Sequence, residues 1–169
     1  MSTLPPQPAI VTADLFDAHH DQIAVIDLQF RSFGRFASFF GPAATLRCFE
    51  DHTPVLAQLE TPGQGRVLVV DARGSLRVGV MGDRLAAKAV ANGWRGVVIN
   101  GAIRDSLGID ALELGVRALG TTARRGWLQN PSETAVSVTI GGVSVSAGHW
   151  IYADRDSVIV APAELPLEP

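Results

Sequence analysis

The sequence predicts a single α/β domain with a parallel sheet at its centre and an antiparallel hairpin towards the C-terminus. Apolar-rich runs at residues 66–70, 97–99 and 116–119 alternate with segments of helical periodicity, a pattern typical of parallel strands joined by helices. Further along, Val and Ile alternate with polar residues on both sides of Gly141-Gly142, which indicates a hairpin. The 169 residues, 47% hydrophobic and 18% charged, are enough for one domain with a real core.

Local sequence signals predict the helices and strands of the first half of the chain. Residues 1–11 hold three prolines and no hydrophobic period, so we expect a mobile tail there, with a second tail at 162–169 and the domain between them at 12–161. Thr12 and Thr53 are expected to cap helices. The elements expected in this half are a helix at 12–20, strands at 23–26 and 44–49, a helix at 53–59 and a strand at 66–70.

Residues 79–105 read as loop, helix, turn, strand and loop. Gly82 and Asp83 stand where the helix should start, and Asn92-Gly93 is a helix stop. Between them, one apolar face recurs at helical spacing, formed by Leu85, Ala86, Ala89 and Val90. The elements expected after this stretch are a helix at 109–112, a strand at 116–119, a polar loop at 121–132, a hairpin at 136–145 and strands at 150–153 and 158–160.

The composition argues against several classes of function. A net charge of -3 without a basic cluster gives no indication of nucleic-acid binding. No apolar run approaches the ~20 residues of a membrane span, and the N-terminus lacks the basic start of a signal peptide. The single cysteine, Cys48, cannot form an intramolecular disulfide. This fits a reducing compartment, so we expect a cytoplasmic protein.

Several catalytic motifs are absent from the sequence. The four histidines form no metal-binding pair, and there is no Gly-x-Ser-x-Gly elbow, phosphate-binding P-loop or Gly-x-Gly-x-x-Gly. Cys48 lies in an apolar run and is interpreted as a buried small hydrophobe rather than a nucleophile. The 14 basic residues include one lysine, Lys88, which points away from the apolar face of its helix. This argues against Schiff-base aldol chemistry and against pyridoxal phosphate chemistry.

Charged residues remain at two loops that can meet at one sheet edge. Asp83 starts a helix, and Arg104-Asp105 follow a buried strand, with twenty residues between Asp83 and Arg104. Ligands of open α/β sheets bind at the carboxyl ends of the strands. A carboxylate such as Asp105 suits Mg²⁺ or Mn²⁺. The backbone amides of residues 82–85 suit an anionic group, and Arg104 suits a carboxylate or a developing enolate.

A purely structural interpretation of the same residues is also available. Asp83 and Asp105 can be helix N-caps, and Arg104 can be a surface ion-pair partner. On spacing alone this interpretation is favoured, because short motifs match frequently by chance.

The sequence resembles the RraA-like family, which includes regulators of ribonuclease E activity and metal-dependent 4-hydroxy-4-methyl-2-oxoglutarate aldolases. The resemblance covers residues 12–160. It is carried by TADL at 12–15, CFED at 48–51, GRVLVVD at 65–71, GDRLA at 82–86, GAIRD at 101–105 and YAD at 152–154. The aldolase members share an Asp, twenty residues and then Arg-Asp, and this chain has the whole pattern.

The resemblance implies a site and an activity. Asp105 would be the metal ligand, Arg104 a substrate contact, and Gly82, Asp83, Arg84 and Leu85 the loop that holds the substrate. The implied enzyme is a lyase dependent on Mg²⁺ or Mn²⁺ that acts on 2-oxo acids through a metal-stabilised pyruvate enolate. It would cleave 4-hydroxy-4-methyl-2-oxoglutarate to pyruvate and decarboxylate oxaloacetate. Asp83 would orient a water that delivers a proton.

The resemblance also implies an architecture: a three-layer β/β/α sandwich of the swivelling-domain type, assembled as a trimer with sites near the subunit interfaces. The stretch from Phe33 to Phe40, which also holds Phe36 and Phe39, has more aromatic bulk than one surface loop should expose. These phenylalanines are expected to fill the core or an interface, so we expect a stable oligomer.

A second interpretation is a regulator that inhibits a ribonuclease by protein–protein contact, without a metal. Retention of the Arg-Asp pair favours the enzyme. The chain departs from the family pattern at Gly34-Arg35-Phe36, at Gly148-His149 and in the loop 123–131. These departures bear on subunit contacts and on the outer wall of the site more than on the metal ligand.

Overall fold

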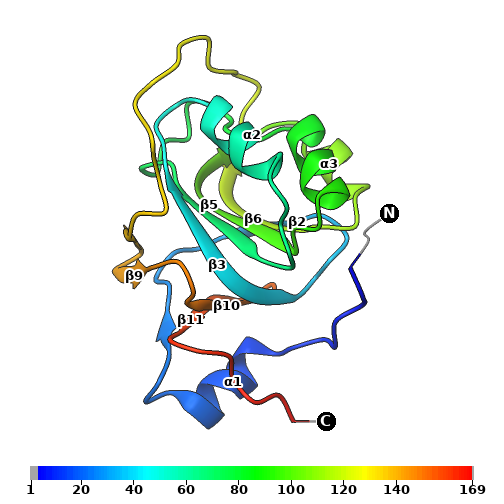
Figure 1. The fold of residues 1–169 in the computed structure, drawn as a ribbon, viewed down its shortest axis with the longest axis vertical. Coiled ribbons are helices and arrows are strands. Elements are labelled where there is room, and N and C mark those ends of the chain that lie inside the picture. Colours follow the sequence, from blue (N-terminus) through cyan, green and yellow to red (C-terminus); the bar gives the residue numbers. More distant parts are fainter. Residues whose placement is uncertain (1–3, 169) are drawn as a thin grey trace.

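A curled, mixed nine-stranded sheet forms the centre of the molecule (Figure 1). The structure is a computed structural model and describes residues 4–168. Along the sheet the strand order is β1 (Ala24–Val25), β11 (Val158–Ala161), β10 (Trp150–Ala153), β3 (Phe39–Arg47), β4 (Val67–Asp71), β5 (Gly96–Ile103), β6 (Gly115–Thr121) and β2 (Arg31–Phe33), with β7 (Glu133–Thr134) paired to β3. Strands β3 to β6 are mutually parallel and the outer strands are antiparallel, which confirms the predicted parallel centre.

The predicted hairpin is present as β8 (Val138–Ile140) and β9 (Val143–Val145). Its two-residue turn is Gly141-Gly142, and both glycines have positive φ, 51° and 76°. A two-residue turn of this kind requires positive φ at both central positions, which glycine adopts without a steric penalty.

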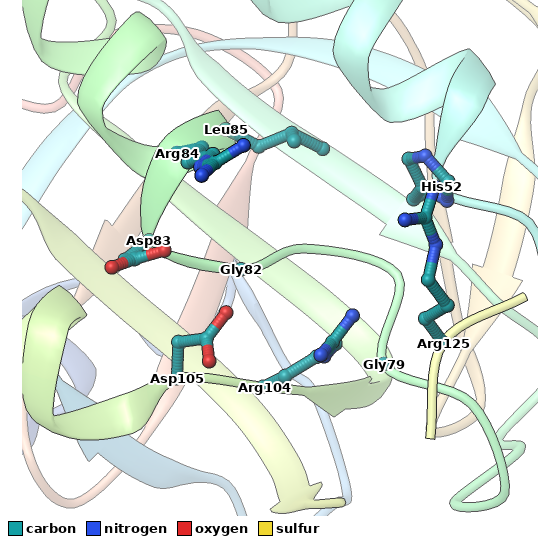
Figure 2. A pocket seen from close by; sticks show the side chains of 9 residues that line it. All are labelled: His52, Gly79, Gly82, Asp83, Arg84, Leu85, Arg104, Asp105 and Arg125. Atoms are coloured by element: carbon teal, nitrogen blue, oxygen red, sulfur yellow. The ribbon is translucent and has the colours of Figure 1, made fainter. Parts of the chain in front are cut away.

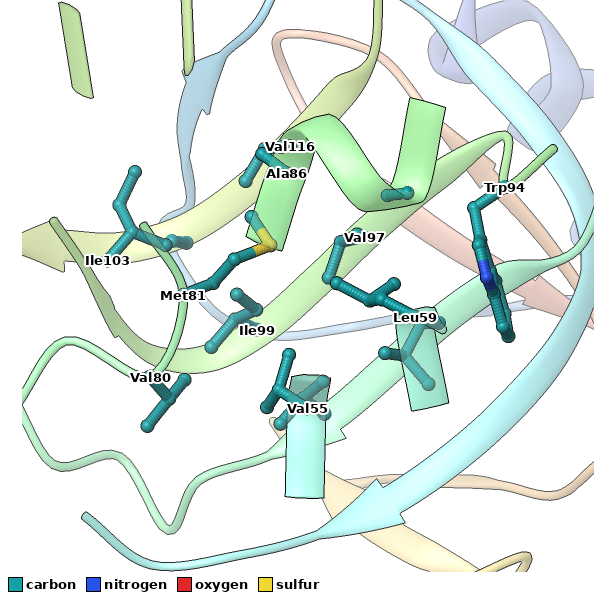
Figure 3. Packing of buried hydrophobic residues seen from close by; sticks show 14 of the residues in the cluster. Val55, Leu59, Val80, Met81, Ala86, Trp94, Val97, Ile99, Ile103 and Val116 are labelled. Atoms are coloured by element: carbon teal, nitrogen blue, oxygen red, sulfur yellow. The ribbon is translucent and has the colours of Figure 1, made fainter. Parts of the chain in front are cut away.

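The helices are α1 (Thr12–His19), α2 (Thr53–Leu59), α3 (Asp83–Ala91) and α4 (Ser106–Asp110). Alternate residues of β4 point to opposite faces of the sheet. Leu68 and Val70 belong to one buried cluster with the helix side chains Val55 and Ala86 and their neighbours. Figure 3 shows Val55 and Ala86 in this cluster. Val67 and Val69 belong to a second cluster with residues of the hairpin and of β10 and β11. The strand is apolar throughout because both of its faces are buried, and the result is the predicted three-layer arrangement.

Helix α3 confirms its predicted apolar face. Ala86, Ala89 and Val90 are buried, and Leu85 packs beside them. The helix ends at Asn92, whose N–H donates to the Lys88 carbonyl, and the following glycine has a φ of 77°.

Neither predicted threonine cap is a cap. Thr12 is the first helical residue of α1. Its N–H and hydroxyl donate to the carboxylate of Asp154 at 2.7 and 2.8 Å. Thr53 likewise donates its N–H (2.9 Å) and hydroxyl (2.8 Å) to Asp51 Oδ1. In both helices an aspartate from outside the helix accepts the N–H of the first helical residue.

The terminal segments make more contacts than the expected mobile tails. The Gln7 side-chain amide donates to the Phe40 carbonyl and accepts from the Phe40 N–H, and Ile10 is buried. Near the other end, Leu165 is buried and its N–H donates to the Tyr152 hydroxyl at 2.7 Å. These contacts join parts of residues 4–11 and 162–168 to the domain, and the expectation that both segments are mobile stays a prediction.

The Phe-rich stretch is accommodated within one chain. Phe33, Phe39 and Phe40 are buried in the core, and Phe36 is half-buried. The prediction of core filling is confirmed, but the aromatic bulk is not exposed, so it no longer argues for an oligomer. The expectation of a trimer then rests on the family resemblance alone. None of the helices within residues 4–168 is both long and apolar enough to cross a membrane.

Candidate active site

A cavity of about 510 Å³ opens at the carboxyl end of the parallel strands, where the sequence placed the site (Figure 2). It lies at the start of α3, the end of β5 and the loop that follows β6. Its lining residues are His52, Gly79, Gly82, Asp83, Arg84, Leu85, Arg104, Asp105 and Arg125. All six residues predicted for the site are in this set.

The two predicted loops meet because the segment before α3 runs alongside the end of β5. Gly79 forms a parallel bridge with Ala102. The Val80 N–H donates to the Ala102 carbonyl, and the Arg104 N–H donates to the Met81 carbonyl, both at 2.9 Å. These backbone bonds hold the start of α3 beside Arg104 although twenty residues separate Asp83 from Arg104.

Two glycines allow this close approach. A Cβ on Gly82 would lie 2.6 Å from Asp105 Oδ2, and a Cβ on Gly79 would overlap Arg104 Cγ. Either alanine would displace a charged side chain of the site. Gly79 is therefore required, because a Cβ there would also lie 3.0 Å from the Ile103 carbonyl carbon, whereas at Gly82 only the flexible end of Asp105 would have to move.

Asp105 occupies the N-cap position of α4 but does not act as a cap. Its side chain makes no capping hydrogen bond, and its φ is 54°, in the left-handed region that non-glycine residues rarely adopt. Asp83 is not a cap either, because the N-cap of α3 is Gly82. The capping interpretation therefore fails for both carboxylates. Asp105 is held in a costly conformation that leaves its carboxylate exposed to the cavity.

The surface ion-pair interpretation of Arg104 fails as well. Its Nε is buried without a hydrogen-bond partner. Among the described residues, the salt bridges use the cations of Arg47, Arg77 and Lys88. The three arginines of the cavity and its two aspartates thus share one space without pairing. Buried polar atoms are normally satisfied, so the unpaired Arg104 Nε indicates a place for a ligand, and the other four side chains, half-buried or exposed, leave their charges open to the same space.

The start of α3 adds donors to this wall. The first helical bond runs from the Ala86 N–H to the Gly82 carbonyl at 3.0 Å. The N–H groups of residues 83–85 therefore lack a carbonyl partner inside the helix and face its open end. Leu85 lines the cavity while its side chain packs on the core, so the polar group that it presents to the cavity is its backbone amide.

The donor set fits a cation that keeps most of its water ligands. No group of three or more His, Cys, Asp or Glu side chains that could hold a metal occurs in the described part of the chain. A fully protein-ligated zinc-type centre is therefore not formed by these residues. An exposed, unpaired carboxylate such as Asp105 matches Mg²⁺ or Mn²⁺, which bind through one or two protein carboxylates and waters.

The structure also confirms the predicted environments of Cys48 and Lys88, the buried thiol and the surface lysine. Cys48 is buried, and burial together with the nearby Asp51 and Asp71 carboxylates raises the pKa of its thiol to about 12. Lys88 points to solvent, where its ammonium lies 3.7 Å from Glu60. Neither group is available as a nucleophile in the cavity.

His52, Gly79 and Arg125 were not predicted as site residues. Gly79 opens the stretch that the sequence singled out, so its position next to Gly82 was a usable signal. His52 and Arg125 lie on loops after β3 and after β6, far from that stretch in sequence. The only available signal was that both loops follow parallel strands and so reach the same edge.

Comparison with known proteins identifies the family. The model of the RraA-like family, described as Aldolase/RraA, matches residues 12–160. A Cupriavidus taiwanensis protein named "Putative 4-hydroxy-4-methyl-2-oxoglutarate aldolase" is 46% identical over 160 residues, which cover 92% of this chain and 97% of that protein. An Aromatoleum aromaticum protein of the same name is 45% identical over 154 residues, covering 91% of this chain and 97% of that protein.

Two solved structures share the fold closely. One, from Geobacillus kaustophilus, is named S-adenosylmethionine: 2-dimethylmenaquinone methyltransferase. It has a TM-score of 0.89 at 44% identity and covers 92% of this chain and 97% of its own. The other is the RNA-processing inhibitor RraA from Thermus thermophilis, with a TM-score of 0.89 at 36% identity. It covers 94% of this chain and 96% of its own. These names describe different functions on one fold. The family match across the whole domain and this identity to its members show that the chain belongs to the RraA-like family.

Proposed function

We propose that this protein is a lyase for 2-oxo acids that cleaves 4-hydroxy-4-methyl-2-oxoglutarate into two molecules of pyruvate and decarboxylates oxaloacetate. The names of the relatives support the aldolase activity. The observation that carries the proposal is the cavity itself, in which three arginines and two aspartates lie without ion pairs among the described residues. This donor set suits a small, multiply charged anion.

Arg104 and the start of α3 bind the 2-oxo acid end of the substrate in this proposal. A guanidinium presents a planar pair of donors that matches a carboxylate, and the buried Arg104 Nε lacks any other partner. The free N–H groups of residues 83–85 point to the same space and favour negative charge. Both features favour the charge that develops on the 2-oxo oxygen during bond cleavage.

Asp105 would hold a divalent cation together with water ligands, as the donor set allows. When bound, this cation would supply positive charge that favours the enolate form of the product.

The retro-aldol step moves one proton and one electron pair. The C4 hydroxyl gives its proton to a water molecule, the C3–C4 bond breaks, and the bond's electron pair stays with C3 as the enolate of pyruvate. C4 becomes the carbonyl carbon of the second pyruvate, and a proton returns to C3. Asp83 lines the cavity next to this centre and is assigned to orient the water that returns the proton.

The test is oxaloacetate decarboxylation and pyruvate release from 4-hydroxy-4-methyl-2-oxoglutarate by the purified protein. Pyruvate is measured with coupled lactate dehydrogenase, with Mg²⁺ and again with excess chelator. We expect both activities with Mg²⁺, loss with chelator and recovery when Mg²⁺ is restored. No pyruvate above the Mg²⁺-only background for either substrate would refute the proposal.

A second candidate function is inhibition of a ribonuclease by direct contact, as the name of the Thermus thermophilis relative suggests. The feature in favour is an exposed apolar pair on the loop after β6, with Trp127 81% and Leu128 75% exposed. Exposed aromatic side chains are common anchors of protein contacts. A ribonuclease E cleavage assay distinguishes this function, because inhibition through the loop would persist in a chelator and would fall in Trp127→Ala.

A further inference from the structure

The cavity has a second wall that the proposed chemistry does not use. His52 and Arg125 line it, and in Figure 2 they lie on the opposite side of the cavity from Asp83. The 2-oxo acid end is held by Arg104 and Asp105, so this second wall faces whatever extends beyond that end. Its chemistry therefore bears on which 2-oxo acid is accepted.

The loop that carries Arg125 is fastened on both sides of that residue. On one side, the Arg124 carbonyl accepts from the Gly79 N–H at 2.9 Å. On the other, the Asn130 N–H donates to the Asp51 carboxylate, also at 2.9 Å. Asp51 is 2% exposed, so the second anchor belongs to the core of the domain. Arg125 is thereby held at the edge of the cavity although its side chain is exposed.

The guanidinium of Arg125 is supported but not neutralised. It lies 4.5 Å from the centroid of the Trp127 ring, a cation–π contact that orients the group while leaving its N–H donors free. It takes no part in the salt bridges found among residues 4–168. This unpaired guanidinium lies across the cavity from Asp83 and suits an anionic group at the far end of a ligand.

We propose that Arg125 binds the carboxylate at the far end of the substrate and so selects 2-oxo dicarboxylates over 2-oxo monocarboxylates. This rests on the proposed function, in which the 2-oxo end lies at Arg104 and Asp105. In 4-hydroxy-4-methyl-2-oxoglutarate the far group is the C5 carboxylate. The volume of about 510 Å³ lies within the usual range for small-molecule sites, roughly 300–1,000 Å³, and leaves room beyond a pyruvate unit.

Two non-cleavable probes isolate this contact. 2-Oxoglutarate and 2-oxopentanoate share the 2-oxo acid end and the chain length, but only the first has a C5 carboxylate, and neither has the C4 hydroxyl needed for cleavage. Calorimetry with Mg²⁺ should show that the wild-type protein binds 2-oxoglutarate more tightly. Arg125→Gln should weaken 2-oxoglutarate binding about tenfold, the low end for a charge-assisted hydrogen bond at an exposed site. It should leave 2-oxopentanoate binding unchanged.

Arg124→Gln is the matched control. It removes the same charge from the neighbouring position, but Arg124 does not line the cavity, and its guanidinium donates to the Arg77 carbonyl at 3.5 Å. The backbone bond from Gly79 to the Arg124 carbonyl does not depend on its side chain. We expect Arg124→Gln to bind both probes with the affinity of the wild-type protein. Weaker binding of 2-oxoglutarate by this variant would show that net charge alone affects binding.

Kinetics give a second, independent reading. Arg125→Gln should raise the KM for 4-hydroxy-4-methyl-2-oxoglutarate. It should leave unchanged the KM for 4-hydroxy-4-methyl-2-oxopentanoate, in which a methyl group replaces the C5 carboxylate. Equal affinity of the wild-type protein for the two probes, or equal losses for both in Arg125→Gln, would overturn the inference. Absence of cleavage with selective 2-oxoglutarate binding intact would refute the proposed activity and leave the role of Arg125 standing.

Discussion

Asp51 and Asp105 stand at equivalent places in the fold and are used in opposite ways. Each follows a parallel strand, β3 or β5, and precedes a short helix. Asp51 is 2% exposed and its carboxylate accepts hydrogen bonds from Thr53 and from the Asn130 N–H. Asp105 is exposed, has a left-handed backbone and makes no capping bond.

This difference separates a structural carboxylate from one that is free for a ligand. A buried carboxylate with all its oxygens satisfied has its charge compensated by the protein and cannot take a cation without losing those bonds. An unpaired one makes no hydrogen bond that stabilises the fold, and at Asp105 it stands on a left-handed backbone that is less favourable than an ordinary one. Sequence spacing alone does not distinguish the two, because both aspartates occupy helix starts.

The largest expected effect tests Asp105. Asp105→Asn keeps the shape, and asparagine tolerates the left-handed backbone better than alanine, so stability should change by less than about 0.5 kcal/mol. The lost charge should remove metal binding, and decarboxylation of oxaloacetate should fall at least about a hundredfold even with excess Mg²⁺. Steady-state kinetics and Mg²⁺ calorimetry measure the two losses. Wild-type activity with unchanged metal dependence would place the active site elsewhere.

Asp51 should show the reverse pattern. Asp51→Ala leaves three donors unsatisfied, two on Thr53 and the Asn130 N–H, and should lower the free energy of unfolding by about 2–4 kcal/mol. Urea denaturation at one fixed protein concentration gives this value, and Mg²⁺ binding at low temperature should be retained. If Asp51→Ala is as stable as Asp105→Asn, the contrast between the two aspartates is wrong.

Arg104 is expected to give a smaller effect on catalysis. Arg104→Lys keeps the charge but replaces a planar fork with a point donor, so kcat and kcat/KM should both fall, by about tenfold to a hundredfold. The measurement is a full saturation curve for oxaloacetate. A change in KM alone would mean that Arg104 holds the substrate equally well before and during the reaction. Unchanged kinetics would return it to the role of a surface charge.

The sequence predicted those parts of the site that local patterns determine. The Asp83 to Asp105 stretch was identified because a helix start and a strand end have recognisable signals and because parallel strands end at one edge. His52 and Arg125 were missed because they come from two other loops, and the loop of Arg125 is held by a bond between Asn130 and Asp51, which lie 79 positions apart. The capping of α1 was misassigned for the same reason, since its partner Asp154 lies 142 positions from Thr12.

The fold shows the same division between local and long-range information. Strands with continuous apolar runs were found, while the short edge strands β2 and β7 carry no periodic signal. β3 begins at Phe39 rather than at residue 44, because Gly41-Pro42 reads as a break but lies within the strand opposite β10. α4 starts at Ser106 rather than at residue 109, directly after the left-handed Asp105.

The smallest expected effect comes from Lys88, the one lysine of the chain. Its ammonium lies at the surface, 3.7 Å from Glu60, in an ion pair of two half-exposed side chains that contributes about 0–1 kcal/mol. Lys88 does not line the cavity, so Lys88→Ala should retain most lyase activity and nearly all stability. Borohydride added to the wild-type protein with pyruvate should trap no adduct, as intact-mass spectrometry would show. A mass increase that disappears in Lys88→Ala would mean that the lysine forms a Schiff base. The unpaired charges around Asp105 would then need another explanation.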